Sequence, residues 1–194
     1  MKKRVALLAS GGGSNAEALL KAMREPGFPA EPVLVFCNRP GAGVLERAAR
    51  FGVPSLLRDH KAYATREAFD AEAVRLIRES GADLLCLAGY TRILTPEFTR
   101  AFEGRILNVH PSLLPKFGGP GMFGRNVHAA VLAAHETESG ATVHWVNEGV
   151  DSGAPILQKS VPVLPGDTPE SLAARVLAVE HVIFPEALRK VCSA

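Results

Sequence analysis

An asparagine and a histidine stand two positions apart at the end of a short apolar run. The run Ile106–Val109 has the length and β-branched content of a buried strand. Side chains at i and i+2 share one face of an extended chain, so Asn108 and His110 are predicted to point the same way. An amide donor beside an imidazole can stabilise an oxyanion and move a proton. The alternative is a polar strand end whose side chains satisfy the backbone of the following loop.

A carboxylate that could complete such a pair lies further along the chain. Asp151 belongs to the sequence Val-Asp-Ser-Gly at 150–153, in a predicted turn between two late strands. Taken by itself, this sequence is typical of a turn. A carboxylate beside an imidazole favours the charged imidazolium and raises its pKa. Asp151 therefore has a catalytic interpretation if the fold brings it to His110.

A glycine-rich segment, Ser-Gly-Gly-Gly-Ser-Asn at 10–15, joins the first apolar run to a predicted helix. Glycines let the backbone approach a ligand closely, and a helix N-terminus offers N–H groups to a phosphate. The segment is neither G-x-G-x-x-G nor a P-loop, because position 16 is alanine and no Gly-Lys-Ser/Thr follows. Ser14 and Glu17 also fit a capping box. A phosphate-binding loop and a tight, capped turn both remain open.

The elements that position these residues alternate along the first half of the chain. Short apolar runs predict strands at Val5–Ala9, Val33–Cys37, Leu84–Ala88 and Ile106–Val109. Helical patterns lie between them at Asn15–Met23, Val44–Phe51 and Thr65–Ser80. This alternation predicts an α/β fold with a parallel sheet. Ligands of such sheets bind beyond the carboxyl ends of the strands, where Asn108 and His110 are expected.

The second half of the chain has a different pattern. A Pro- and Gly-rich stretch predicts a long loop over 110–124, followed by a helix at Asn126–Ala134. Strands are predicted at Thr142–Val146 and Ile156–Val163. A last helix should start near Thr168, with Pro169 in its first turn and Pro185 kinking or ending it.

Composition excludes several classes of protein. The 194 residues suggest one domain, and a net charge of +2 does not suggest a basic face for nucleic acid. No apolar run approaches the length of a transmembrane helix. The three cysteines, Cys37, Cys86 and Cys192, lack metal-ligand spacing, so we expect no metal and reduced thiols in a cytoplasmic protein.

Four segments, taken together and in order, resemble the glycinamide ribonucleotide transformylases. These are the formyltransferases of de novo purine (IMP) biosynthesis that use 10-formyltetrahydrofolate. The segments are Ser-Gly-x-Gly-Ser-Asn at 10–15, Leu-Ala-Gly-Tyr-Thr-Arg-Ile-Leu at 87–94, Asn-Val-His-Pro-Ser-Leu-Leu-Pro at 108–115 and Val-Asp-Ser-Gly at 150–153. The resemblance implies a Rossmann-like formyltransferase fold and a single domain over 1–194. Its N-terminal half would bind the nucleotide phosphate and its C-terminal half the folate.

The resemblance also implies ligand-binding roles. Gly13, Ser14 and Asn15 match the loop that holds the phosphate of glycinamide ribonucleotide, and Glu180 matches an acidic residue that meets the same substrate. The positions that match folate-binding residues are Arg66, Thr91, Arg92, Ile93, Leu94 and Asn108. The implied ligands are glycinamide ribonucleotide and the cosubstrate 10-formyltetrahydrofolate. No metal, nucleic acid or membrane is implied, and the protein would be a monomer or a homodimer.

Asn108, His110 and Asp151 match the family's catalytic trio. The substrate amine would attack the formyl carbon directly and form a tetrahedral intermediate. Asn108 would stabilise the oxyanion, His110 would be the proton donor, and Asp151 would hold His110 in its charged form. No covalent enzyme intermediate is required.

Four positions depart from the family pattern. Gly12 stands where many relatives carry Asn, and Leu177 stands where relatives often have a polar residue near the substrate. The stretch 117–125 is several residues longer than the usual connection, and Asn126 replaces one of two histidines while His128 matches the other. The loop beside the active site is therefore expected to be ordered differently.

Two other functions share parts of this pattern. A formyltetrahydrofolate hydrolase or a methionyl-tRNA formyltransferase would use the same Asn-His-Asp chemistry. Each would carry an extra domain for which 194 residues leave no room, and each usually lacks the proline that Pro111 supplies. A non-catalytic nucleotide- or folate-binding protein is the other alternative, and the intact trio argues against it.

Overall fold

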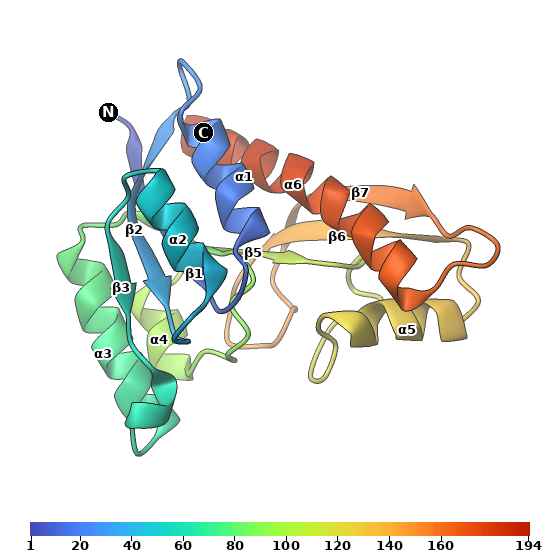
Figure 1. The fold of residues 1–194 in the computed structure, drawn as a ribbon, viewed down its shortest axis with the longest axis horizontal. Helices are drawn as coiled ribbons and strands as arrows, with labels where there is room; N and C mark the ends of the chain where they lie inside the picture. The colour runs from blue at the N-terminus through green and yellow to red at the C-terminus, as the bar shows by residue number, and fades with distance from the viewer.

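A seven-stranded sheet in the order β3-β2-β1-β4-β5-β6-β7 forms the centre of the protein (Figure 1). It is seen in a computed structural model that describes residues 1–194. The strands are β1 (Lys3–Ala9), β2 (Ala30–Cys37), β3 (Ser55–Leu57), β4 (Leu84–Leu87), β5 (Ile106–His110), β6 (Glu138–Trp145) and β7 (Pro155–Pro162). The first five strands are parallel, whereas β6 runs antiparallel to β5 and β7 antiparallel to β6. The predicted α/β fold with a mostly parallel sheet is confirmed.

Helices cover both faces of this sheet. They are α1 (Ser14–Met23), α2 (Gly43–Arg50), α3 (Arg66–Glu79), α4 (Pro96–Ala101), α5 (Arg125–Ala133) and α6 (Pro169–Ser193), with a short 3₁₀ helix, η1, at His60–Ala62. Buried side chains of α1, α2, α5 and α6 share one core with the sheet, and those of α3 and α4 share a second core on its other face. In Figure 1 the long helix α6 crosses over β6 and beside α1.

The central strand β1 shows why the apolar runs are continuous. Every residue from Val5 to Ala9 is fully buried. Val5, Leu7 and Ala9 belong to the core under α1 and α6, whereas Ala6 and Leu8 belong to the core under α3 and α4. A strand covered on both faces needs apolar side chains in both directions, so it shows no alternation with polar residues.

The last helix begins as predicted but continues further. Thr168 is its N-cap in a capping box with Ser171, and Pro169 lies in the first turn. The prediction that Pro185 might end the helix is wrong, because α6 continues to Ser193. Phe184 and Leu188 are fully buried on either side of this proline. Their burial offsets a backbone cost of about 3 kcal/mol for an internal proline.

Three short elements were not predicted from the sequence. They are β3 and η1, each of three residues, and α4, of six residues. Elements of this length carry too few turns or alternations to give a periodic signal. Between His110 and Arg125 the chain has neither helix nor strand, in agreement with the predicted long loop.

The Thr168 cap gives a stability prediction. Thr168→Ala removes the side chain that accepts from the Ser171 N–H, so the free energy of unfolding should fall by about 1 kcal/mol. Urea unfolding measures this change. Thr137→Ala is the control, because Thr137 is exposed and contributes only its backbone carbonyl, which accepts from Val163. An equal loss in both variants would contradict the capping role.

Candidate active site

Asn108 and His110 lie at the carboxyl end of β5 and line a cavity of about 670 Å³. Both occupy one face of the strand, as their spacing predicted. His110 is buried, with 4% of its surface exposed, and Asn108 is partly exposed. Asp151 lines the same cavity from the segment between β6 and β7. The structure thus brings together three residues that are up to 43 positions apart in the numbering (108 to 151).

The two ring nitrogens of His110 have different neighbours. Nδ1 lies 3.4 Å from the Asp151 carboxylate, and Nε2 lies 2.8 Å from the carbonyl oxygen of Phe117. A carbonyl oxygen only accepts, so Nε2 carries a hydrogen and donates it to Phe117. Nδ1 is therefore the nitrogen whose proton can change during a reaction. When both nitrogens are protonated, each N–H faces an oxygen acceptor.

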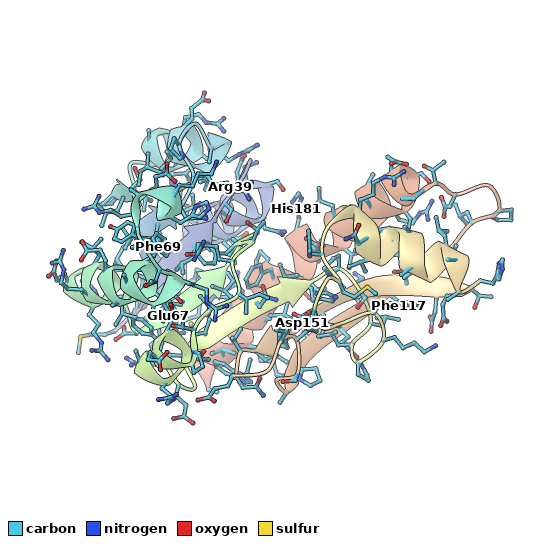
Figure 2. All side chains as sticks on the ribbon, turned by 90° about the horizontal axis from the view of Figure 1, so that it is seen from below. Arg39, Glu67, Phe69, Phe117, Asp151 and His181 are labelled. Atoms are coloured by element: carbon cyan, nitrogen blue, oxygen red, sulfur yellow. The ribbon has the colours of Figure 1, made fainter.

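The backbone that supplies these acceptors adopts rare conformations. Phe117 and Asp151 are non-glycine residues with positive φ angles of 54° and 52°. They lie on neighbouring loops in Figure 2, and Gly119 N donates to Asp151 Oδ2 at 3.1 Å. Left-handed backbone at such residues costs about 1–3 kcal/mol and persists where the surroundings determine it. The strain at both residues aims an oxygen atom at the same imidazole.

His144 is a member of the site that the sequence did not reveal. It lies opposite Asn108 in the antiparallel pair of β5 and β6, and only 1% of its surface is exposed. Its Nδ1 lies 2.9 Å from the Trp145 carbonyl, so Nδ1 carries the hydrogen and Nε2 is free to accept. Nε2 lies 3.1 Å from Asn108 Nδ2 and 3.7 Å from Asp151. Burial lowers the pKa of His144, which favours this neutral tautomer.

His144 has the hydrogen bonds of an ordinary buried strand histidine, but its position opposite Asn108 makes it part of the site. The signal that could have found it is the alternation of Thr142 and His144 on a strand beside Asn108 and His110. Recognising this signal requires the register of β5 against β6, which no local pattern contains.

The glycine-rich loop reaches the other end of the cavity only at Asn15, the one residue of 10–15 that lines it. Gly13 is the N-cap of α1 at φ 77°, and a Cβ atom there would lie 2.6 Å from the Val44 side chain. The predicted capping box of Ser14 and Glu17 is wrong, because no side chain caps this helix. Gly13 takes the cap position, so Ser14 is already helical. The first-turn N–H groups of α1 are left for another acceptor, which is the setting of an anion site.

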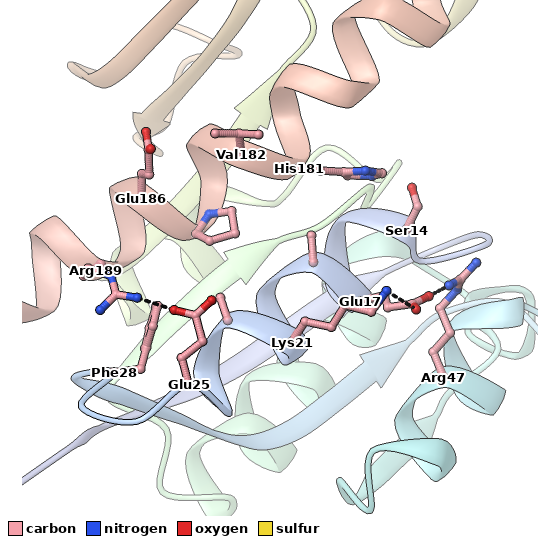
Figure 3. Close-up of a pocket in the computed structure, with 13 residues that line it drawn as sticks. Ser14, Glu17, Lys21, Glu25, Phe28, Arg47, His181, Val182, Glu186 and Arg189 are labelled. Carbon is pink, nitrogen blue, oxygen red and sulfur yellow. Dashed lines mark hydrogen bonds and ion pairs between the residues drawn. The ribbon is translucent and has the colours of Figure 1, made fainter.

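Ser14 lines a second groove, of about 580 Å³, between α1 and α6 and does not line the cavity that holds His110 (Figure 3). His181 of α6 lines this groove too. Burial lowers the pKa of His181, and the positive charges of Lys21 and Arg47 lower it further. The Nε2 atom of His181 is buried and has no hydrogen-bond partner. Glu17 forms ion pairs with Lys21, Arg47 and Arg50. Three cations thus share one carboxylate near the start of α1, which favours an additional anion there.

Glu180 connects α6 to the glycine-rich loop. Asn15 Nδ2 donates to Glu180 Oε2 at 2.6 Å, and both residues line the cavity with His110. Burial raises the pKa of Glu180 to about 7, against a smaller lowering by the Asn15 hydrogen bond. Asn15 Oδ1 is buried without a partner. The pair therefore keeps an unused acceptor beside the cavity.

The segment from Thr91 to Leu94, between β4 and α4, lines the cavity on the side of α3. Thr91 N donates to Ser10 Oγ at 2.9 Å, which ties this segment to the glycine-rich loop. The Arg92 guanidinium lies 4.8 Å from the centre of the Phe69 ring. Arg66 is placed differently from these residues. It begins α3 with its side chain 46% exposed, 3.8 Å from Glu67, and it does not line the cavity.

The long loop after His110 covers the cavity on another side. Its lining residues include Gly119, Pro120, Gly121, Met122, Phe123 and Gly124. Phe123 is 65% exposed although it is aromatic. His128 of α5 also lines the cavity. Burial lowers the pKa of His128, and the proximity of His110 lowers it further. Leu177 is 36% exposed on the cavity wall, so it offers an apolar contact where a polar one was expected from the family pattern.

The structure contains neither a metal-binding cluster nor a helix that could span a membrane. No group of three or more His, Cys, Asp and Glu side chains is arranged to hold a metal ion. Among the helices, none combines the length and the apolar character needed to cross a membrane.

Comparison with known proteins matches residues 3–188 to the family described as formyl transferase. The chain is 49% identical to the trifunctional purine biosynthetic protein adenosine-3 of Drosophila pseudoobscura pseudoobscura, over 99% of this chain but 14% of that protein. It is 40% identical to the chloroplastic phosphoribosylglycinamide formyltransferase of Arabidopsis thaliana, over 98% of this chain and 66% of that protein.

Solved structures agree with these relatives. The phosphoribosylglycinamide formyltransferase from Brucella melitensis superposes with a TM-score of 0.92 at 44% identity, covering 100% of this chain and 97% of that one. Glycinamide ribonucleotide transformylase 1 from Symbiobacterium toebii gives a TM-score of 0.94 at 44% identity, covering 99% and 88%.

The buried Glu180 predicts a pH dependence of stability. The folded protein holds a proton there up to a pKa of about 7, whereas an exposed glutamate releases it near 4.5. The free energy of unfolding should therefore fall as the pH rises from about 4.5 to 7, by roughly 3 kcal/mol from this group. Glu180→Gln should lack that fall in urea unfolding at pH 5 and pH 8. Glu186→Gln, at an exposed position of the same helix, should retain it. Equal falls in both variants would contradict the prediction.

Proposed function

The chain belongs to the formyl transferase family, and we propose that it transfers the formyl group of 10-formyltetrahydrofolate to the amino group of glycinamide ribonucleotide. The observation that carries this proposal is the meeting of Asn108, His110 and Asp151 in one cavity. That cavity extends from Asn15, at the start of α1, to the segment Thr91–Leu94. The products would be formylglycinamide ribonucleotide and tetrahydrofolate.

Substrate binding is proposed at the two ends of the cavity. Gly13, Ser14 and Asn15 would hold the nucleotide phosphate, which the uncapped start of α1 supports. Glu180 would accept from hydroxyl groups of the same substrate. The folate would lie along the segment Thr91–Leu94 and Asn108, where Ile93 is an exposed apolar side chain (52%) on the cavity wall.

The outlying Arg66 is proposed to contact the far end of the folate, outside the cavity. Its side chain is free to reach in that direction, since its contact with Glu67 is a surface one. Substrate residues thus come from both halves of the chain, and we propose that residues 1–194 act as one formyltransferase domain. The free thiols of Cys37, Cys86 and Cys192 fit a reducing compartment such as the cytoplasm.

Asn108 is proposed to stabilise the oxyanion. The cosubstrate supplies an electrophilic formyl carbon, and attack by the substrate amine places negative charge on the formyl oxygen. One Nδ2 hydrogen of Asn108 faces His144 Nε2, so the other is left for this oxygen. His144 Nε2 can accept a hydrogen bond but cannot donate one. The Asn108 amide is therefore oriented with its nitrogen, and not its oxygen, toward His144.

His110 and Asp151 are proposed to move the protons. His110 Nδ1–H would give its proton to the leaving folate nitrogen, while the Asp151 carboxylate stabilises the imidazolium beforehand. One proton leaves the attacking amine and one reaches the leaving nitrogen, so the pair undergoes no net change. Asp151 would take part in returning the amine proton to His110 through water.

The decisive assay follows tetrahydrofolate release from 10-formyltetrahydrofolate, with and without glycinamide ribonucleotide. We expect release only when the nucleotide is present, and His110→Ala should lower its rate roughly 10²- to 10⁴-fold. His135→Asn is the matched control, because His135 is exposed and asparagine tolerates its φ of 53°. Release without the nucleotide would favour a hydrolase, and full activity of His110→Ala would remove His110 from the mechanism.

Asp151→Asn tests the carboxylate while keeping a side chain that tolerates the φ of 52°. The imidazolium of His110 loses its counter-charge in this variant. The rate of formyl transfer should fall roughly 10- to 100-fold near neutral pH. A rate of formyl transfer equal to that of the unmodified protein would reject this role.

A further inference from the structure

Three buried polar atoms without partners belong to residues of the cavity wall and of the helix packed behind it. They are Asp70 Oδ1 on α3, Tyr90 Oη at the end of β4, and Arg92 Nε in the segment Thr91–Leu94. Asp70 is 1% exposed and Tyr90 is 9% exposed. Tyr90 and Arg92 line the cavity, whereas Asp70 lies behind them. Burial raises the pKa of the Tyr90 hydroxyl, and the negative charge of Asp70 raises this pKa further. The positive charge of Arg92 lowers it, so both residues act on Tyr90 as charged neighbours.

Asp70 Oδ1, Tyr90 Oη and Arg92 Nε find no hydrogen-bond partners within the protein. Tyr90 and Arg92 each bring a hydrogen to donate, and Asp70 brings a carboxylate oxygen that only accepts. A buried polar atom without a partner destabilises the folded state, and such atoms in proteins are usually satisfied by an internal water. One water molecule can accept from two donors and donate to one acceptor, which matches these three atoms.

Asp70 also fixes the end of the segment that lines the cavity. Its Oδ2 accepts from Thr95 N at 2.8 Å, and Thr95 is the N-cap of α4. At the other end, Thr91 is held by Ser10. Arg92 lies over Phe69, the neighbour of Asp70 on α3. The segment is therefore anchored at both ends, and its middle rests on the same turn of α3.

We propose that a single buried water links Asp70, Tyr90 and Arg92, and that Asp70 and Tyr90 are positioning residues for the cosubstrate-binding segment Thr91–Leu94. The water completes the hydrogen bonds of all three side chains. Because Asp70 is on α3, the water holds the Arg92 guanidinium and the backbone of Thr91–Leu94 in place against this helix. These are the groups proposed to face the folate. The assignment of this segment to the folate rests on the proposed function.

Tyr90→Phe provides the sharpest test, because it removes only the hydroxyl and keeps the ring in the core. Its dissociation constant for tetrahydrofolate, measured by calorimetry, should rise about fivefold, the effect of one net hydrogen bond. The constant for glycinamide ribonucleotide should not change. Tyr63→Phe is the matched control: Tyr63 packs on the same Phe69 ring, with centroids 5.3 Å apart, but does not line the cavity. It should leave both constants unchanged.

Asp70→Asn should weaken tetrahydrofolate binding in the same direction. In the double variant the two losses should not add, because both act through one water. Additive losses, or weaker binding of both ligands, would overturn the positioning role. If Asp70→Asn fails to fold, Tyr90→Phe still decides, since an unchanged constant for tetrahydrofolate contradicts the proposal.

A crystal structure of the ligand-free protein tests the water itself. Density for one water within about 3.2 Å of Asp70 Oδ1, Tyr90 Oη and Arg92 Nε is the expected result. A direct hydrogen bond between Tyr90 and Asp70, with no water, would overturn the proposal. This outcome is independent of the proposed function, whereas failure of the unmodified protein to bind tetrahydrofolate would contradict the proposed function instead.

Discussion

The antiparallel pairing of β6 with β5 is the constraint on which the site depends. It places His144 opposite Asn108 and Thr142 opposite His110, on a sheet whose other inner strands are parallel. Because β6 runs antiparallel, its last residue, Trp145, lies opposite Leu107 near the start of β5. The segment between β6 and β7 folds back from there, and this places Asp151 3.4 Å from His110 and 3.7 Å from His144. The catalytic geometry therefore depends on the register of β5 against β6 and on this returning segment.

Around this pairing, backbone carbonyls rather than side chains decide the state of the two histidines. Trp145 fixes the tautomer of His144, and Phe117 fixes the nitrogen of His110 that always carries hydrogen. Each ring is left with one nitrogen for a functional task. His144 accepts from Asn108, and His110 faces Asp151.

The sequence predicted the parts of the molecule that depend on local patterns. The four early strands, the spacing of Asn108 and His110, the Thr168 cap and the family were all predicted, and the structure and the comparisons confirm the strands, the cap and the family. The missed or wrong parts depend on contacts distant in sequence. His144 needed the β5–β6 register, and α6 passes Pro185 because residues on both sides are buried by the sheet. At Ser14 the left-handed Gly13 displaced the expected cap by one residue.

The hydrogen bonds from His110 to Phe117 and from Gly119 to Asp151 have a consequence for timing. Both belong to the glycine- and proline-rich loop that follows His110. When this loop is seated, its backbone orients the imidazole and occupies one lone pair of the carboxylate. When it is displaced, the ring loses its fixed acceptor and the carboxylate gains a free site for water. Seating of the loop and orientation of the imidazole are therefore a single event.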